Sequence, residues 1–305
     1  MKTQKNTRTN TAKVAPYEAI TNAILERLES GVAPWRKPWK AGTMPINAVS
    51  GKCYRGINLL ALSLAPYTEH RWLTFKQAQD LGGSVRLGEK STKIIFWNFD
   101  RKEQDDSDKK RAAPWCKPSF VFNVEQCDNL TKLKPLSEVL PSENLLTPIE
   151  SAQLIADAMP NPPSLRHGGD SAHYAPTLDS VTMPQLNQFA DADSYYSTLF
   201  HELGHSTGAA KRLNRAGIVE PIRFGSDKYA LEELVAELCA AFVCAASGVD
   251  NSLDQSAAYV KGWASKISQD SRFLLTAAGQ AQRAADYILG VKFGEQKEDS
   301  EDSAE

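Results

Sequence analysis

The sequence has no run of about 18 consecutive apolar residues, the minimum that a membrane-spanning helix requires. The N-terminal segment from Met1 to Arg8 also lacks the apolar stretch of a secretory signal peptide. We therefore expect no membrane partner and a cytoplasmic location. The 305 residues are 42% hydrophobic and 24% charged, which is typical of a soluble globular protein with two domains.

Cysteine and histidine are scarce, with five residues of each. The cysteines form an odd set without any CxxC pair, which argues against a disulfide framework and against a zinc ribbon. They are Cys53, Cys116, Cys127, Cys239 and Cys244. We expect the last two to pack inside a helical core.

Two of the five histidines belong to an HExxH motif, His-Glu-Leu-Gly-His, at residues 201 to 205. On a helix, positions i and i+4 lie one turn apart on the same face, so His201 and His205 can bind one metal ion. Asp193 or Ser194 can cap such a helix at its N-terminus. The spacing predicts a Zn²⁺ site, with another divalent metal as an alternative, in which Glu202 takes a proton from a coordinated water.

A catalytic zinc usually has three protein ligands, so one more residue must complete the site. Lys211 stands where the metzincin pattern HExxHxxGxxH requires its third histidine, which excludes that family. A later apolar helix offers three glutamates instead. We predict Glu233 as the third ligand and Glu237, one turn later, as a partner of a histidine or as the alternative ligand. We expect Glu232 to be exposed to solvent.

The net charge of −2 conceals an uneven distribution. Residues 1–135 contain 23 lysines and arginines against 13 acidic residues, a net charge of +10, and residues 136–305 have a net charge of −12. A basic half suits a polyanion whose phosphates release counterions on binding. The charge pattern therefore indicates nucleic acid as a partner of the N-terminal half.

Aromatic residues accompany the positive charge. Five of the six tryptophans fall in this half: Trp35, Trp39, Trp72, Trp97 and Trp115. Those at positions 72 and 97 lie in apolar runs and are expected in the core, whereas Trp35 and Trp39 alternate with cations in Pro-Trp-Arg-Lys-Pro-Trp-Lys. Unstacked bases bind to exposed aromatic rings flanked by cations, so we expect these two tryptophans at the surface.

Local patterns predict an α+β fold. A helix is expected from about Tyr17 to Ser30, and a strand from Lys93 to Phe99 is expected to pair with Phe120 to Val124. Arg55 and Asn58 fall near the start of another helix, where backbone N–H groups bind phosphate readily.

The C-terminal half is predicted to be mainly helical. His173-Tyr174 and Asp179 to Met183 are expected to form paired strands before the HExxH helix. The second of these is expected to be an edge strand able to bind an extended peptide. Two further helices, with apolar residues from Ala258 to Ile267 and from Phe273 to Ile288, are expected to close the domain.

Several segments together resemble the ArdC-type antirestriction family of plasmids and other mobile elements. In the N-terminal half they are Gly31 to Trp35, Gly51 to Asn58, Trp72 to Ala78, Gly88 to Lys90 and Phe122 to Gln126. In the C-terminal half they are Tyr174 to Asp179, Met183-Pro184, Tyr195-Tyr196, Phe200 to Gly208, Arg212 to Arg215 and Tyr229 to Phe242.

The resemblance implies a small α+β domain that binds single-stranded DNA, joined to a mainly helical, zincin-like metallopeptidase domain with a short antiparallel sheet. It further implies a plasmid-encoded protein that protects DNA entering by conjugation from host restriction and that can itself pass into the recipient cell. A protein or peptide substrate is a further expectation from the resemblance. We place the DNA contacts at Trp35, Arg36, Lys37, Trp39, Lys40, Lys52, Tyr54, Arg55, Asn58, Lys76, Arg86 and Lys90.

The predicted organisation is a basic disordered tail (1–13), the DNA-binding domain (14–135), a linker (136–149), the metallopeptidase domain (150–290) and an acidic disordered tail (291–305). Three hypotheses for the function stay open. The protein shields DNA by binding it, or it cleaves a restriction or other DNA-bound protein with DNA binding serving to localise it. In the third, the C-terminal half cleaves a regulatory protein and DNA binding is incidental.

Overall fold

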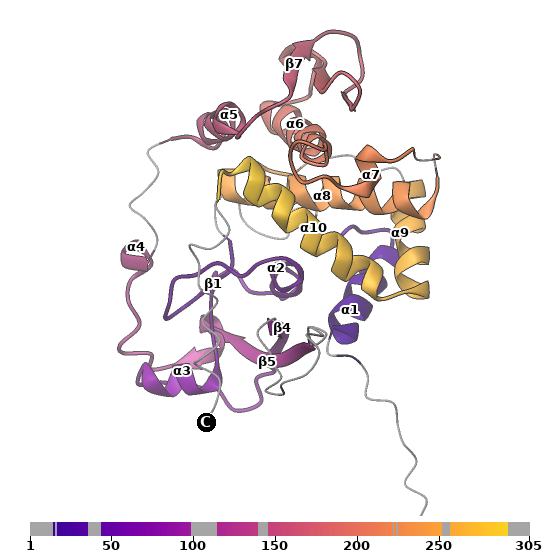
Figure 1. Cartoon of the computed structure of the whole chain (residues 1–305). Coiled ribbons are helices and arrows are strands. Elements are labelled where there is room, and N and C mark those ends of the chain that lie inside the picture. The colour runs from indigo at the N-terminus through magenta and orange to yellow at the C-terminus, as the bar shows by residue number, and fades with distance from the viewer. Residues whose placement is uncertain are drawn as a thin grey trace, which may run out of the picture.

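Figure 1 shows the computed structural model of the chain. The structure describes residues 15, 17–35, 44–98, 115–139, 146–221, 223, 225–251 and 257–291. The predicted basic tail, the predicted acidic tail apart from its first residue and four predicted DNA contacts lie outside these residues. Those four are Arg36, Lys37, Trp39 and Lys40. Within the described part, no helix is both long enough and apolar enough to cross a bilayer.

The N-terminal half combines short helices with a four-stranded sheet of order β1-β2-β5-β4. Its elements are α1 (Glu18–Glu29), β1 (Ile46–Asn47), α2 (Ile57–Ser63), β2 (Arg71–Leu73), α3 (Phe75–Asp80), β3 (Ser84–Val85), β4 (Thr92–Asn98), β5 (Trp115–Asn123), η1 (Val124–Gln126) and β6 (Cys127–Asp128). Strands β4 and β5 are antiparallel, as their alternating sequences predicted, with Lys93 opposite Phe120. The predicted α+β class is confirmed.

The C-terminal half is mainly helical. It contains α4 (Leu136–Val139), α5 (Pro148–Ala158), β7 (Ser164–His167), β8 (His173–Ala175), β9 (Ser180–Met183), η2 (Leu186–Gln188), α6 (Ala192–Ser206), α7 (Ala216–Val219), α8 (Asp227–Ser247), α9 (Ala257–Gln269) and α10 (Arg272–Ile288). The predicted pairing of β8 with β9 is confirmed and is antiparallel. The prediction that β9 forms an edge is wrong, because β7 pairs with its other side in parallel and β9 is the central strand.

Helix α8 is the centre of the C-terminal half. All its residues from Leu234 to Ala245 are buried, which is expected of a helix surrounded by protein on every side. It packs between α6 and α10, and α10 crosses it in Figure 1. Helix α10 approaches closely because the side chains that it buries are mostly small, namely Ala277, Ala278, Ala281, Ala284 and Ala285.

The two halves share one hydrophobic core. Helix α1 packs on α9, α2 packs on α10, and their apolar residues belong to the same buried cluster as α8. The linker predicted from composition therefore joins two regions whose cores are continuous. This continuity places the start of the N-terminal half against the helices that support the HExxH segment.

Candidate metal centre

Helix α6 presents both histidines of the HExxH motif to α8. The helix begins after Asp191, whose side chain accepts a hydrogen bond of 2.7 Å from the backbone N–H of Ser194, so the cap lies two residues before the predicted Asp193. Gly204, inside the motif, faces α8. A Cβ there would lie 3.3 Å from Cα of Ala236, so glycine allows α6 and α8 to approach closely.

This close approach brings His201, His205 and Glu233 together. The two Nε2 atoms are 3.2 Å apart, and the Glu233 carboxylate oxygens lie 3.9 Å from Nε2 of His201 and 3.7 Å from Nε2 of His205. Ligand atoms of a tetrahedral zinc site are about 3.4 Å apart, given zinc–nitrogen bonds of about 2.0–2.1 Å. The three side chains thus fit a divalent metal ion, with both Nε2 atoms directed at the same position.

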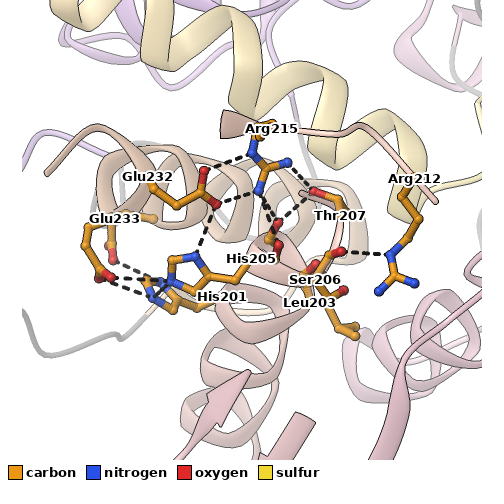
Figure 2. Close-up of polar contacts among 11 residues, drawn as sticks. His201, Leu203, His205, Ser206, Thr207, Arg212, Arg215, Glu232 and Glu233 are labelled. Atoms are coloured by element: carbon orange, nitrogen blue, oxygen red, sulfur yellow. Dashed lines mark hydrogen bonds and ion pairs between the residues drawn. The ribbon is translucent and has the colours of Figure 1, made fainter. Parts of the chain in front are cut away.

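A carboxylate lies beside the other nitrogen of each ring. Nδ1 of His205 lies 3.2 Å from Glu232 (Figure 2). Nδ1 of His201 lies 3.6 Å from Glu237, which is an ion-pair distance and longer than a hydrogen bond. Carboxylates in these positions favour the tautomer with hydrogen on Nδ1 and a lone pair on Nε2, the form that binds a metal. The prediction that Glu232 faces solvent is wrong.

Glu232 is buried because Arg215 pairs with it. Its Oε1 and Oε2 accept hydrogen bonds of 2.6 and 3.0 Å from the guanidinium, which also donates to Oγ1 of Thr207 and to the carbonyl of Gly204 (Figure 2). Gly217 packs against Glu232 so closely that a Cβ at this position would lie 2.6 Å from the carboxylate. Sequence periodicity missed Arg215 and Glu232. The signal available was their position in two of the segments that resemble the ArdC family, Arg212 to Arg215 and Tyr229 to Phe242.

Carboxylates give the site a strongly negative potential. Burial lowers the pKa of His201, but Glu237, Glu202 and Glu233 outweigh that effect and raise it to about 9. Burial raises the pKa of Glu232, yet hydrogen bonds from His205 and Arg215 lower it below its usual value. The site therefore favours a positive charge between the two histidines, as a metal site requires.

Two of the predicted DNA contacts, Trp35 and Tyr54, are buried in the structure. The prediction of Trp35 as a surface residue is wrong, because it is fully buried and packs edge-on against Trp263 of α9 with ring centroids 5.8 Å apart. Tyr54 is also buried, and burial raises the pKa of its hydroxyl to about 12. No base can stack on either ring without opening the core.

Arg55 and Asn58 have structural partners at the start of α2. Arg55 forms an ion pair with Asp286 of α10, and the backbone N–H of Gly56 donates to Gln282 of the same helix at 2.8 Å. Asn58 bonds both backbone groups of Ile95, at 2.7 and 2.8 Å, on the side of β4 that lacks a neighbouring strand in the four-stranded sheet. Two groups of the predicted phosphate site, the Arg55 guanidinium and the Gly56 N–H, therefore bind to α10.

Four other predicted contacts, Lys52, Lys76, Arg86 and Lys90, are exposed. Arg86 forms ion pairs with Glu89 and Asp128, at 2.9 and 3.5 Å. The positions of the other three remain compatible with contacts to a polyanion.

Comparison with known proteins identifies both halves. Residues 15–122 match the N-terminal domain of anti-restriction factor ArdC, and residues 153–280 match the zincin-like metallopeptidase family. The crystal structure of metal-free ArdC from the R388 plasmid has a TM-score of 0.71 and 34% identity, covering 89% of this chain and 96% of that chain. This chain belongs to the ArdC antirestriction family. The Mn(II)-bound ArdC structure is equally similar, with a TM-score of 0.71, 33% identity and coverage of 92% of this chain and 99% of that chain.

Two curated relatives extend the comparison. The protein y4eC of Sinorhizobium fredii is 36% identical over 290 residues, which cover 89% of this ArdC family member and 91% of y4eC. DNA primase TraC of Escherichia coli is 36% identical over 297 residues, 90% of this chain but 20% of TraC. A second TraC sequence is matched over 27% of its length, so the chain spans only a fraction of these primases. The zincin-like domain implies a divalent metal, and the Mn(II)-bound relative leaves open whether that metal is zinc.

Proposed function

We propose that this protein binds single-stranded DNA through its N-terminal half and thereby protects entering plasmid DNA from restriction in the cytoplasm. Support comes from the match to the ArdC N-terminal domain and from an exposed aromatic face on its sheet. Because Trp35 and Tyr54 are buried, the bases of bound DNA must stack on other aromatic side chains.

The aromatic face lies along β5. Phe120 and Phe122 are two residues apart and point to the same side of the sheet, and Phe75 of α3 packs edge-on against Phe122 with centroids 6.5 Å apart. The exposed fractions of Phe75 and Phe120 are 52% and 51%. An unpaired strand presents base faces that stack on such rings.

Lysines flank this face. Lys93 of β4 lies directly opposite Phe120 in the antiparallel register, and Lys76 follows Phe75 and is exposed. Cations beside stacked rings neutralise the phosphates that connect successive bases. The aromatic face and its lysines therefore match the chemistry of single-stranded DNA.

Phe120→Ala is expected to weaken binding of the full chain to a labelled single-stranded oligonucleotide by about fivefold or more, because stacking contributes about 1–3 kcal/mol per base. Phe96→Ala is the matched control, since Phe96 is 47% exposed on the opposite face of the same strand pair. Fluorescence anisotropy at several salt concentrations measures both variants. Equal losses in the two variants would contradict the proposed face.

For the C-terminal half we propose His201, His205 and Glu233 as ligands of a divalent metal, zinc or another, and Glu202 as general base. A bound divalent cation supplies a coordinated water of lowered pKa. Glu202 is buried beside His201, and its carboxylate would take up the proton. This arrangement favours a second candidate function, hydrolysis of a restriction or regulatory protein.

Glu202→Gln separates shielding from hydrolysis, because it keeps the size of the side chain and removes the base. We expect the variant to bind metal and to keep the protection of a plasmid entering as single-stranded DNA into restricting cells. Transfer efficiency, with matched expression of variant and unaltered protein, measures protection. Lost protection in a folded, metal-binding variant would instead show that hydrolysis is part of the mechanism.

A further inference from the structure

Of the large apolar side chains that the structure describes, Leu87 is the most exposed. Its exposed fraction is 106%, and the next highest, that of Leu178, is 68%. Burial of apolar surface is what makes a leucine stabilise a fold, so a fully exposed leucine contributes nothing in this way. The whole apolar surface of Leu87 is instead available to a binding partner.

Leu87 stands at the tip of a tight turn. The backbone N–H of Glu89 donates to the carbonyl of Arg86 at 3.3 Å, and Gly88 has a φ of +88°. A positive φ at the third position is typical of a type II turn, which favours glycine there and places Leu87 at the second position. The tip is open, since a Cβ on Gly88 would meet none of the described residues within 4 Å.

Gln126 holds the base of this turn on both sides of Leu87. The backbone N–H of Arg86 donates to the carbonyl of Gln126 at 2.9 Å. The side-chain amide of Gln126 donates to the carbonyl of Lys90 at 2.9 Å and to the Glu89 carboxylate at 3.0 Å. Because Gln126 is itself fully buried, the leucine is presented on a rigid support.

The turn lies at the Phe122 end of the aromatic face. Gln126 follows Phe122 by four residues along the chain. Val85, two residues before Leu87, packs against the same hydrophobic cluster as Phe122. Lys90 is exposed directly after the turn. A strand of DNA that stacks on the aromatic face would therefore reach Leu87 next.

The charges of the turn favour contact with bases rather than with phosphates. Arg86 pairs with Glu89 and Asp128, at 2.9 and 3.5 Å, so these two acidic residues offset Arg86 and Lys90. The distinctive chemistry of the turn is thus apolar. Proteins that bend or open DNA insert aliphatic side chains, leucine among them, between neighbouring bases and unstack them.

We propose that Leu87 is a wedge that inserts between two bases of single-stranded DNA bound along the aromatic face. The proposal rests on the DNA-binding function proposed above and adds a base contact that uses neither a ring nor a charge. A rigid support suits this role, because a mobile side chain would lose more conformational freedom on insertion. One base step is unstacked at the turn.

Binding of the full chain to single-stranded oligonucleotides that carry 2-aminopurine at successive positions tests the wedge. Emission of 2-aminopurine rises when the base is unstacked, and anisotropy measures affinity in the same samples. We expect Leu87→Ala to lower affinity on the order of tenfold and to abolish the emission rise at one position. The salt dependence of binding should stay unchanged, because no phosphate contact is lost. Leu87→Met should preserve both signals, since methionine also inserts between bases.

Leu178→Ala is the matched control, because Leu178 is an exposed leucine of the C-terminal half, and it should leave affinity and emission unchanged. If Leu87→Ala behaves like this control while Phe120→Ala binds weakly, the wedge is overturned and the aromatic face stands. A loss of affinity with the emission rise intact, or with a weaker salt dependence, would also overturn insertion. If the unaltered protein does not bind the oligonucleotides, both proposals fail.

Discussion

His205→Ala is expected to lower the affinity for a divalent metal by at least about 100-fold. The three proposed ligands share a binding free energy on the order of 10 kcal/mol, so the loss of one removes about a third of it. The variant also removes one of the two partners of Glu232, since Nδ1 of His205 lies 3.2 Å from that carboxylate, and this loss disturbs the support of the site. Calorimetric titration with Zn(II) or Mn(II) measures the loss.

His173→Ala provides the matched control, because His173 is exposed on β8 and is not part of the His201, His205 and Glu233 group. We expect it to bind metal with unchanged affinity. If His205→Ala bound metal as tightly as the control, the proposed ligand set would have to be abandoned. A comparison of both ions also shows which one the site prefers.

Arg215→Met is expected to destabilise the protein by about 3–5 kcal/mol, the cost of leaving one member of a buried ion pair without its partner. The exposed fractions of Arg215 and Glu232 are only 7% and 5%, so water cannot replace the lost guanidinium. Methionine preserves most of the side-chain volume. Urea unfolding at neutral pH measures the change, and Arg223→Met, at an exposed position, should have little effect.

The effect of Arg215→Met should depend on pH. Arg215 and His205 hold the pKa of Glu232 below its usual value, so ionised Glu232 stabilises the fold above the unfolded pKa of about 4.3. This contribution is lost as pH falls through the lower, folded value. We therefore expect the difference in unfolding free energy between the unaltered protein and the variant to be larger at pH 7 than at acidic pH. A difference independent of pH would contradict the assigned ion pair.

Local sequence patterns predicted most elements of the fold. The periodicity of apolar residues located α1, α9 and α10, and alternation located the pairing of β4 with β5. The HExxH spacing placed two histidines on one helical face, because residues four apart on a helix are neighbours wherever that helix lies. These features depend on residues close in sequence, which is why sequence alone was sufficient for them.

Contacts between distant segments could not be predicted in this way. Trp35 lies among cations in the sequence, yet it is buried because α9 covers it. Arg55 pairs with Asp286, more than 200 residues away, so its charge does not mark a free surface. An amino-acid pattern shows the chemistry of a side chain but not which distant element packs against it.

The sequence by itself determined that this ArdC family member has an HExxH helix, a following helix rich in glutamate and a basic N-terminal half. The tertiary structure decided which glutamate faces which atom. Adjacent residues of α8 point about 100° apart, so Glu232 meets Nδ1 of His205 and Arg215, whereas Glu233 meets the Nε2 atoms. That choice depends on how α8 is rotated against α6, and the rotation is set by packing at Gly204 and Ala236.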